Sequence, residues 1–248
     1  MPYFEKHNTL FIHIPKNAGS YVESSLGISD SWGLGVGPGN PKRIDQIIER
    51  LKIFKRSFSN VDTLRLQQAL KIFGPLPGQY LLQHATLSEV LSLGLLDPST
   101  FAHTFCFCIK RHPVARLISI YKYWQFDKNY PNFEDFCEDV VLLSSRWRNF
   151  HLTYEIRTHL RLQIDYMKLP DGTIPPWLSI IEIDDLTEFW QKQVDRHNWP
   201  LLKPLSHKSR NQTVNSDFTA DDVSSRCLEI IHQTYHDDFV NLGYEFSS

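Results

Sequence analysis

A short apolar segment followed by a polar loop sets the strongest constraint on what this chain can fold into. Residues 9–14 are mostly apolar and β-prone, so we expect a buried strand there. Pro15 ends this strand because it has no N–H group to donate to a neighbouring strand. Gly19 is expected to permit a tight turn, and Ser20 to begin a helix that runs to Leu26.

The loop between this strand and helix is a candidate anion site. A strand, a short loop and a helix bring several backbone N–H groups and a helix N-terminus to one place, which favours phosphate or sulfate. Lys16 adds a mobile positive charge for the same anion. The loop is not a Walker A motif, in which the lysine directly follows a glycine. An ordinary turn with a solvated lysine remains an alternative for this segment alone.

Composition excludes several classes of protein. The chain has 248 residues and a formal net charge of −2, which argues against a general nucleic-acid binder. Its four cysteines have neither CxxC nor zinc-site spacing, so we expect free thiols in a reducing compartment. No apolar run approaches the ~18 residues of a transmembrane helix, and no secretion signal is evident, so a cytoplasmic location is expected.

Two further predicted strands end at polar residues. A short strand at residues 79–83 is followed by His84, and a buried strand at residues 104–109 runs into Arg111. A helix after the second of these strands carries Ser119. Ligands bind at the carboxyl ends of strands in open α/β sheets, so His84 and Arg111 are candidate functional residues. A structural histidine is the alternative for His84.

Local patterns predict the remaining elements. Thr86 and Glu89 form a capping box at the start of a helix. Residues 177–183 are expected to form a strand, and residues 184–196 an amphipathic helix. Thr219 is expected to cap the last long helix.

Two of these segments resemble motifs of sulfotransferases that use the donor 3'-phosphoadenosine 5'-phosphosulfate. Residues 15–20, Pro-Lys-Asn-Ala-Gly-Ser, resemble the family's 5'-phosphosulfate loop. The family's 3'-phosphate motif is matched at Arg111, Pro113, Arg116, Ser119 and Tyr121. His112 departs from that motif, which usually has an acidic or amide residue there. The order and separation of the two motifs match the family, and one donor with two phosphate-bearing ends explains both.

The resemblance implies an α/β fold of the P-loop-like kind, with three layers and a central, mostly parallel sheet flanked by helices. It implies a single domain over residues 1–248, with a helical insert at about residues 29–78. Among sulfotransferases, the chain is most similar to the branch that modifies carbohydrates. The expected reaction moves a sulfuryl group from the donor to an acceptor hydroxyl, on a glycan or a small molecule. No metal, nucleic acid or membrane span is expected to be involved.

The resemblance also assigns roles to individual residues. Lys16 and His84 are the candidate catalytic residues: Lys16 stabilises the leaving phosphate oxygen, and His84 takes the acceptor proton, with Glu23 or His13 as alternative bases. The candidate donor-binding residues form three groups along the chain. They are Lys16, Asn17, Ala18, Gly19 and Ser20 at the 5'-phosphate, Arg111 and Ser119 at the 3'-phosphate, and Lys208, Ser209 and Arg210 in a loop over the donor.

Two rival functions remain open at this stage. One is a non-catalytic module that binds a nucleotide or a sulfated ligand, which would keep the anion loops and lose the base. The other is a P-loop kinase-like phosphotransferase, which would need a Walker A lysine and a strand-end aspartate for Mg²⁺. Neither of those two features is found in the required arrangement.

Overall fold

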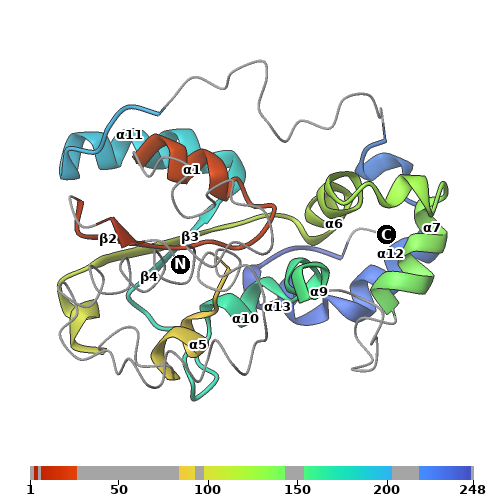
Figure 1. Ribbon diagram of the computed structural model, residues 1–248, viewed down its shortest axis with the longest axis horizontal. Coiled ribbons are helices and arrows are strands. Elements are labelled where there is room, and N and C mark those ends of the chain that lie inside the picture. Colours follow the sequence, from red (N-terminus) through yellow and green to blue (C-terminus); the bar gives the residue numbers. More distant parts are fainter. Residues whose placement is uncertain are drawn as a thin grey trace, which may run out of the picture. The chain divides into compact units, whose positions relative to one another are not determined.

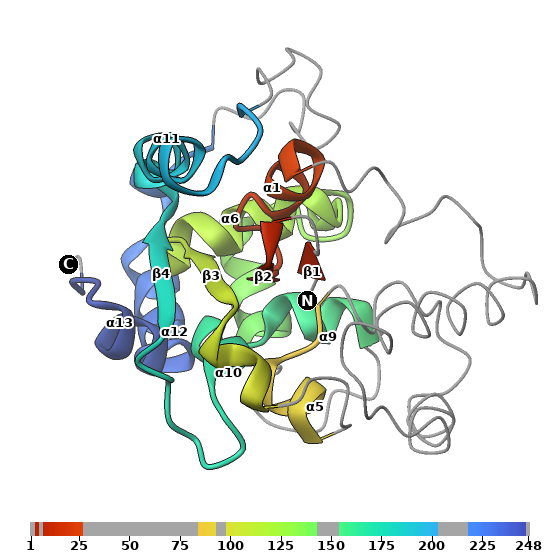
Figure 2. The same ribbon diagram turned by 90° about the vertical axis from the view of Figure 1, so that its left-hand side faces the viewer.

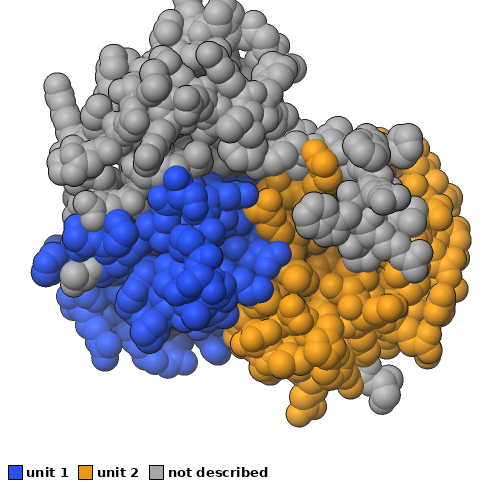
Figure 3. Space-filling model, turned by 90° about the horizontal axis from the view of Figure 1, so that it is seen from below, with its two compact units in different colours: residues 1–14, 18–109, 165–203 blue, residues 15–17, 110–164, 204–248 orange. Residues whose placement is uncertain are grey.

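A computed structural model of the chain describes residues 3–4, 7–26, 84–92, 98–142, 154–202 and 218–246 (Figure 1). The chain divides into two compact units, which are coloured separately in Figure 3. Unit 1 comprises Met1–Ile14, Ala18–Ile109 and Asp165–Lys203, and unit 2 comprises Pro15–Asn17, Lys110–Ile164 and Pro204–Ser248. The short segment Pro15–Asn17 therefore belongs to a different unit from the residues on both sides of it.

Unit 1 is built on a sheet with the strand order β1-β2-β3-β4, which Figure 2 shows from right to left. The strands are β1 (Tyr3–Phe4), β2 (Thr9–Ile12), β3 (Phe105–Lys110) and β4 (Leu178–Glu182). β1 is antiparallel to β2, whereas β2, β3 and β4 form a small parallel sheet. β2 is buried along its whole length, as expected for a parallel strand covered on both faces.

Helices cover this sheet. Figure 1 shows α1 (Gly19–Leu26) and α11 (Leu186–His197) on one side of the strands and α5 (Leu87–Ser92) on the other. Two 3₁₀ turns, η2 (Pro98–Ala102) and η5 (Ile183–Asp185), precede β3 and α11. α1, α11 and the sheet share one buried core, made of Phe4, Phe11, Val22, Leu26, Phe107, Ile109, Leu186, Trp190 and Trp199. The amphipathic pattern predicted for residues 184–196 thus corresponds to a helix whose apolar side joins this core.

The described part of unit 2 after Lys110 is helical. Its first half contains α6 (Pro113–Tyr123), the 3₁₀ turn η3 (Phe126–Lys128), α7 (Phe133–Phe136), the π-helical turn η4 (Cys137–Val141) and α9 (Tyr154–Leu160). Its second half contains η6 (Ala220–Asp222), α12 (Ser225–Thr234) and α13 (His236–Leu242). α10 (Gln163–Met167) begins in unit 2 and ends in unit 1. α6, α7, α9, α12 and α13 contribute to a second buried core, which includes Leu117, Phe136, Leu160, Ile231 and Phe239.

One helix start differs from the sequence prediction. Thr219 caps the short turn η6, where its N–H and hydroxyl groups both donate to the Asp222 carboxylate. The long helix α12 is capped instead by Ser224, whose hydroxyl accepts a hydrogen bond from Cys227 N at 3.2 Å. Threonine and serine are both favourable N-cap residues, and the residues between Thr219 and Ser224 form the separate turn η6.

The mixed α/β class and the parallel sheet flanked by helices are confirmed. The finer P-loop-like assignment and the single-domain assignment stay predictions. The expected insert at 29–78 and the strand at 79–83 fall outside the residues that the structure describes. None of the described helices combines the length and the apolar character that crossing a membrane requires.

Candidate functional site

We define Pro15–Asn17 as the lysine loop. Each of its three residues makes a hydrogen bond to another segment of unit 2. Arg116 Nε donates to the first carbonyl oxygen of the loop at 3.1 Å. Arg111 Nη1 donates to the carbonyl oxygen of Lys16 at 3.2 Å. The side-chain amide of Asn17 donates to Gln163 Oε1 at 2.6 Å. These contacts explain why three successive residues pack with unit 2 although the chain on both sides of them belongs to unit 1.

Gln163 connects the lysine loop to the turn that carries Arg111. Its Oε1 atom also accepts a hydrogen bond from Arg111 N at 3.0 Å, and its Nε2 atom donates to Arg111 O at 2.8 Å. The side chain is fully buried. Asp238 in α13 accepts hydrogen bonds from the backbone N–H groups of Gln163 and Ile164, and so caps the first turn of α10. The Gln163 side chain thereby links the lysine loop to Arg111. The sequence motifs assign these two segments to the 5'-phosphate and the 3'-phosphate of the donor.

Arg116 has a structural role in this arrangement. Its guanidinium is buried and donates to the carbonyl oxygens of Arg161 at 3.0 Å and His159 at 2.7 Å, in addition to the lysine loop. Three backbone carbonyls from two segments therefore satisfy the charged group, as a buried cation requires. Arg116 therefore supports the backbone of the lysine loop, whereas Arg111 is half-buried.

Lys16 and Arg111 form a pair of neighbouring cations. Burial, and secondly the positive charge of Arg111, lower the pKa of Lys16 from 10.5 to about 8. Lys16 Nζ lies 3.8 Å from the centre of the Tyr123 ring, at the C-terminal end of α6. Two like charges at one place repel each other, and a bound anion would relieve that repulsion.

The backbone of the loop is strained at two non-glycine residues. Lys16 has φ 68° and Ala18 has φ 59°, in the left-handed region that costs about 1–2 kcal/mol for residues with a Cβ atom. Such alternation of backbone conformation turns successive N–H groups toward one point and is typical of anion-binding loops. The expectation that Gly19 permits the tight turn is wrong, because Gly19 is the first residue of α1 and its φ is not positive.

Gly19 is instead required by close packing. A Cβ atom at Gly19 would lie 1.9 Å from Nε2 of His13, so the imidazole occupies the space of a side chain. The His13 ring is buried, and its Nδ1 atom lies 2.6 Å from Oε1 of Glu23 in α1. This hydrogen bond fixes the ring against the first turn of the helix.

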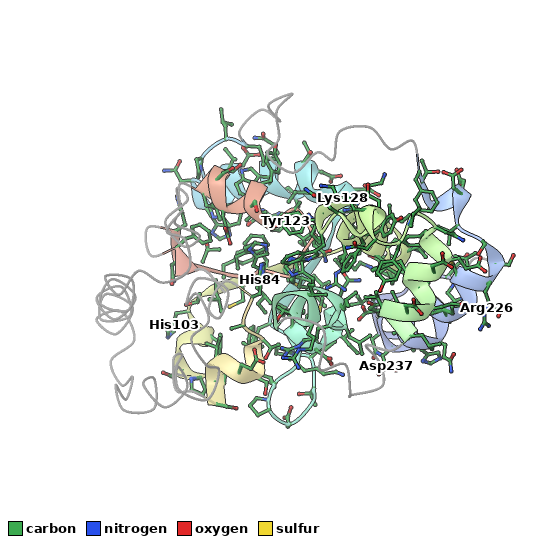
Figure 4. The ribbon with its side chains drawn as sticks, turned by 45° about the vertical axis from the view of Figure 1, so that its right-hand side comes forward. His84, His103, Tyr123, Lys128, Arg226 and Asp237 are labelled. Carbon is green, nitrogen blue, oxygen red and sulfur yellow. The ribbon has the colours of Figure 1, made fainter. Side chains whose placement is uncertain are left out.

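His84 lies beside the same ring, within unit 1. The His84 and His13 rings meet edge to face at a centroid distance of 4.4 Å, and Nδ1 of His84 lies 3.3 Å from the backbone oxygen of His13. Because a carbonyl only accepts, this contact assigns the proton to Nδ1 and leaves Nε2 as the acceptor in the neutral ring. His84 is labelled in Figure 4, just before the capping box in which Thr86 N donates to Glu89 and Glu89 N to Thr86.

The other predicted site residues are distributed as follows. Ala18 and Gly19 lie at the start of α1 in unit 1, and Ser20 is exposed in its first turn. Ser119 is half-buried on α6 in unit 2, the unit that also holds Arg111. Lys16 and His84 belong to different units. The lid candidates Lys208, Ser209 and Arg210 lie outside the residues that the structure describes.

Sequence reasoning missed Gln163, Asp238 and Tyr123. No spacing rule connects position 163 to positions 17 and 111, so the sequence offered no signal for the link between the loops. Tyr123 lies two residues after Tyr121, the last matched residue of the second motif, and its position at the end of an amphipathic helix was the one available hint.

The arrangement can bind an anion. A lysine and an arginine lie together in unit 2, on loops whose backbone is held by buried side chains. All four cysteines are free and buried, and in the described ranges no group of three or more His, Cys, Asp or Glu side chains could hold a metal ion. Comparison of the chain with models of protein families, with curated proteins and with solved structures found no match.

Proposed function

We propose that this protein is a sulfotransferase. It would move a sulfuryl group from 3'-phosphoadenosine 5'-phosphosulfate to an acceptor hydroxyl on a carbohydrate or small molecule. The observation that carries the proposal is the direct contact between the lysine loop and Arg111, at 3.2 Å from Nη1 to the carbonyl oxygen of Lys16. A donor with a phosphosulfate at one end and a 3'-phosphate at the other needs two cationic groups close enough for one molecule to reach both.

The lysine loop would bind the phosphosulfate end of the donor. In the transfer, the bond between sulfur and the bridging oxygen breaks while a bond from sulfur to the acceptor oxygen forms. Negative charge then develops on the departing phosphate, and Lys16 would stabilise it together with the N–H groups of Ala18, Gly19 and Ser20. Arg111 and Ser119 would hold the 3'-phosphate of the same molecule. The leaving product is adenosine 3',5'-bisphosphate.

His84 would accept the proton of the acceptor hydroxyl. Its contact with the backbone oxygen of His13 supports this role, because the tautomer protonated at Nδ1 presents a basic Nε2 atom. Most of the rate enhancement would come from positioning and electrostatic stabilisation, as in phosphoryl transfer.

Calorimetric titration with adenosine 3',5'-bisphosphate tests donor binding. We expect the wild-type protein to bind this nucleotide more tightly than 5'-AMP, which lacks the 3'-phosphate. Arg111→Ala is expected to remove most of that difference, since the guanidinium would pair with the 3'-phosphate. Lys128→Ala is the matched control, because Lys128 is an exposed cation of the same unit, labelled in Figure 4. Equal affinity for the two nucleotides would remove the 3'-phosphate assignment.

Transfer is tested by release of adenosine 3',5'-bisphosphate from the donor in the presence of a panel of hydroxyl acceptors. Lys16→Ala and His84→Ala are each expected to lower turnover by ~10²-fold or more. Nucleotide binding without transfer to any acceptor would favour a non-catalytic binding module. Magnesium-dependent ATP turnover would favour the phosphotransferase alternative.

A further inference from the structure

Tyr123 holds the side chain of Lys16 in unit 2. It is the last residue of α6, it is labelled in Figure 4, and 40% of it is exposed. Lys16 Nζ lies 3.8 Å from the centre of its ring, within the range of a cation–π interaction. The Tyr123 ring in turn stacks on the buried His159, with a centroid distance of 5.6 Å and an interplanar angle of 13°. The ring is thus supported from α9 in a fixed orientation.

In the described part of unit 2, two arginines and one histidine face Lys16 or Tyr123. Arg111 donates to the carbonyl oxygen of Lys16, and it is the charged group that lowers the pKa of that lysine. Arg116 donates to the preceding carbonyl oxygen, and His159 lies behind the tyrosine. The negative face of an aromatic ring favours the ammonium form, so Tyr123 opposes both burial and the repulsion from Arg111.

We propose that Tyr123 is a positioning residue for the anion site, whose ring holds the Lys16 side chain in its charged form beside Arg111 before the donor binds. The role of Tyr123 in anion binding rests on the proposed function, whereas the contact between Tyr123 and Lys16 does not. Lys16 contributes to anion binding only as the ammonium ion. Because the pKa of Lys16 is about 8, any group that favours its charged form strengthens anion binding near physiological pH.

The test compares Tyr123→Leu with Tyr123→Phe in the full-length protein. Leucine keeps an apolar side chain next to Lys16 and removes the π face, whereas phenylalanine keeps the π face and removes the hydroxyl. The partly exposed position at the end of a helix makes both changes compatible with folding. The direct readout is the pH titration of the Lys16 Cε resonance in lysine-labelled protein without ligand. Its signal is assigned by its disappearance in Lys16→Met.

In Tyr123→Leu we expect the Lys16 titration to move to lower pH by about half a unit, the equivalent of an exposed cation–π interaction. In Tyr123→Phe the titration is expected to stay near that of the wild type. An unchanged or higher midpoint in Tyr123→Leu would overturn the proposal, as would an equal shift in both variants.

The second readout is the pH dependence of adenosine 3',5'-bisphosphate binding. With Tyr123→Leu, the loss of affinity on the alkaline side is expected to begin at lower pH, with little change at pH 6, where the lysine is charged in both proteins. An alkaline limb that coincides with that of the wild type would contradict the proposed role. If the wild-type protein binds no nucleotide, the proposed function fails, and the Lys16 titration still decides the role of Tyr123.

Discussion

Gly19 shows how one missing side chain supports the candidate site. The imidazole of His13 fills the space beside its Cα atom, and Glu23 holds that imidazole at 2.6 Å. His84 then packs its ring edge against His13. Any side chain at position 19 would have to displace a buried ring that is hydrogen-bonded on its far side.

We predict that Gly19→Ala lowers the free energy of unfolding by about 1–3 kcal/mol, as overpacking of a buried site does. Urea denaturation followed by fluorescence measures the change. Ser20→Ala is the control, because Ser20 is the exposed neighbour in the same helical turn and should change stability by about 0.5 kcal/mol or less. In a His13→Ala background the cost of Gly19→Ala should become much smaller. An equal cost in both backgrounds would show that the imidazole is not the obstacle.

Some helices of this chain are capped by residues close to them in sequence, and others by residues far away in sequence. The capping box of α5 uses Thr86 and Glu89, which are three positions apart, and it was predicted for that reason. α10 is capped by Asp238, which follows Gln163 by 75 positions. That carboxylate is fully buried, and its two oxygens accept from two successive backbone N–H groups.

We predict that Asp238→Asn destabilises the protein by roughly 1.5–3 kcal/mol, the range for a hydrogen bond to a charged group. The asparagine amide replaces one acceptor oxygen by a donor, so one backbone N–H group at the start of α10 loses its partner. Thermal or urea unfolding provides the measurement. Asp237→Asn removes the neighbouring carboxylate, which is exposed and labelled in Figure 4, and should leave stability nearly unchanged. Similar losses in the two variants would contradict the capping role.

Across the whole chain, the candidate anion site of unit 2 depends on contacts between segments that are far apart in sequence. Asn17 and Gln163 are 146 positions apart, and Arg111 and Gln163 are 52 apart. Gln163 is the common partner, and it is itself held by Asp238 from the last helix. The geometry of two loops therefore depends on one buried amide.

We predict that Gln163→Leu weakens both stability and nucleotide binding. Leucine has a similar volume but leaves the buried Asn17 amide and the part-buried N–H and carbonyl groups of Arg111 without this partner, at about 1–3 kcal/mol for an unsatisfied buried group. Affinity for adenosine 3',5'-bisphosphate should fall because the lysine loop and Arg111 lose their common support. Gln191→Leu is the control, since Gln191 is exposed on α11 and outside the site. Normal affinity in folded Gln163→Leu would show that the amide supports the fold alone.

Several parts of the fold were predictable for local physical reasons. Apolar, β-prone runs located β2 and β3, and the break after β2 located α1. Helical spacing of apolar residues located α6 and α11, and the ends of these elements moved by a few residues. Among the site residues, Lys16 and Arg111 were predicted to serve one ligand, and in the structure they are hydrogen-bonded neighbours. The strained φ angles of Lys16 and Ala18 were not predictable, because residue preference points to Gly19.

Patterns within short windows were thus sufficient to locate strands, helices and the two loops that carry the cations, because periodicity, caps and proline act over a few residues. The residues that hold those loops in place were decided by the tertiary structure. The hydrogen bonds of Gln163, Arg116 and Asp238 depend on which distant segments pack together, and the sequence next to the loops does not indicate that packing. The close fit of His13 against Gly19 arises in the same way, from the packing of β2's end on the helix that follows it.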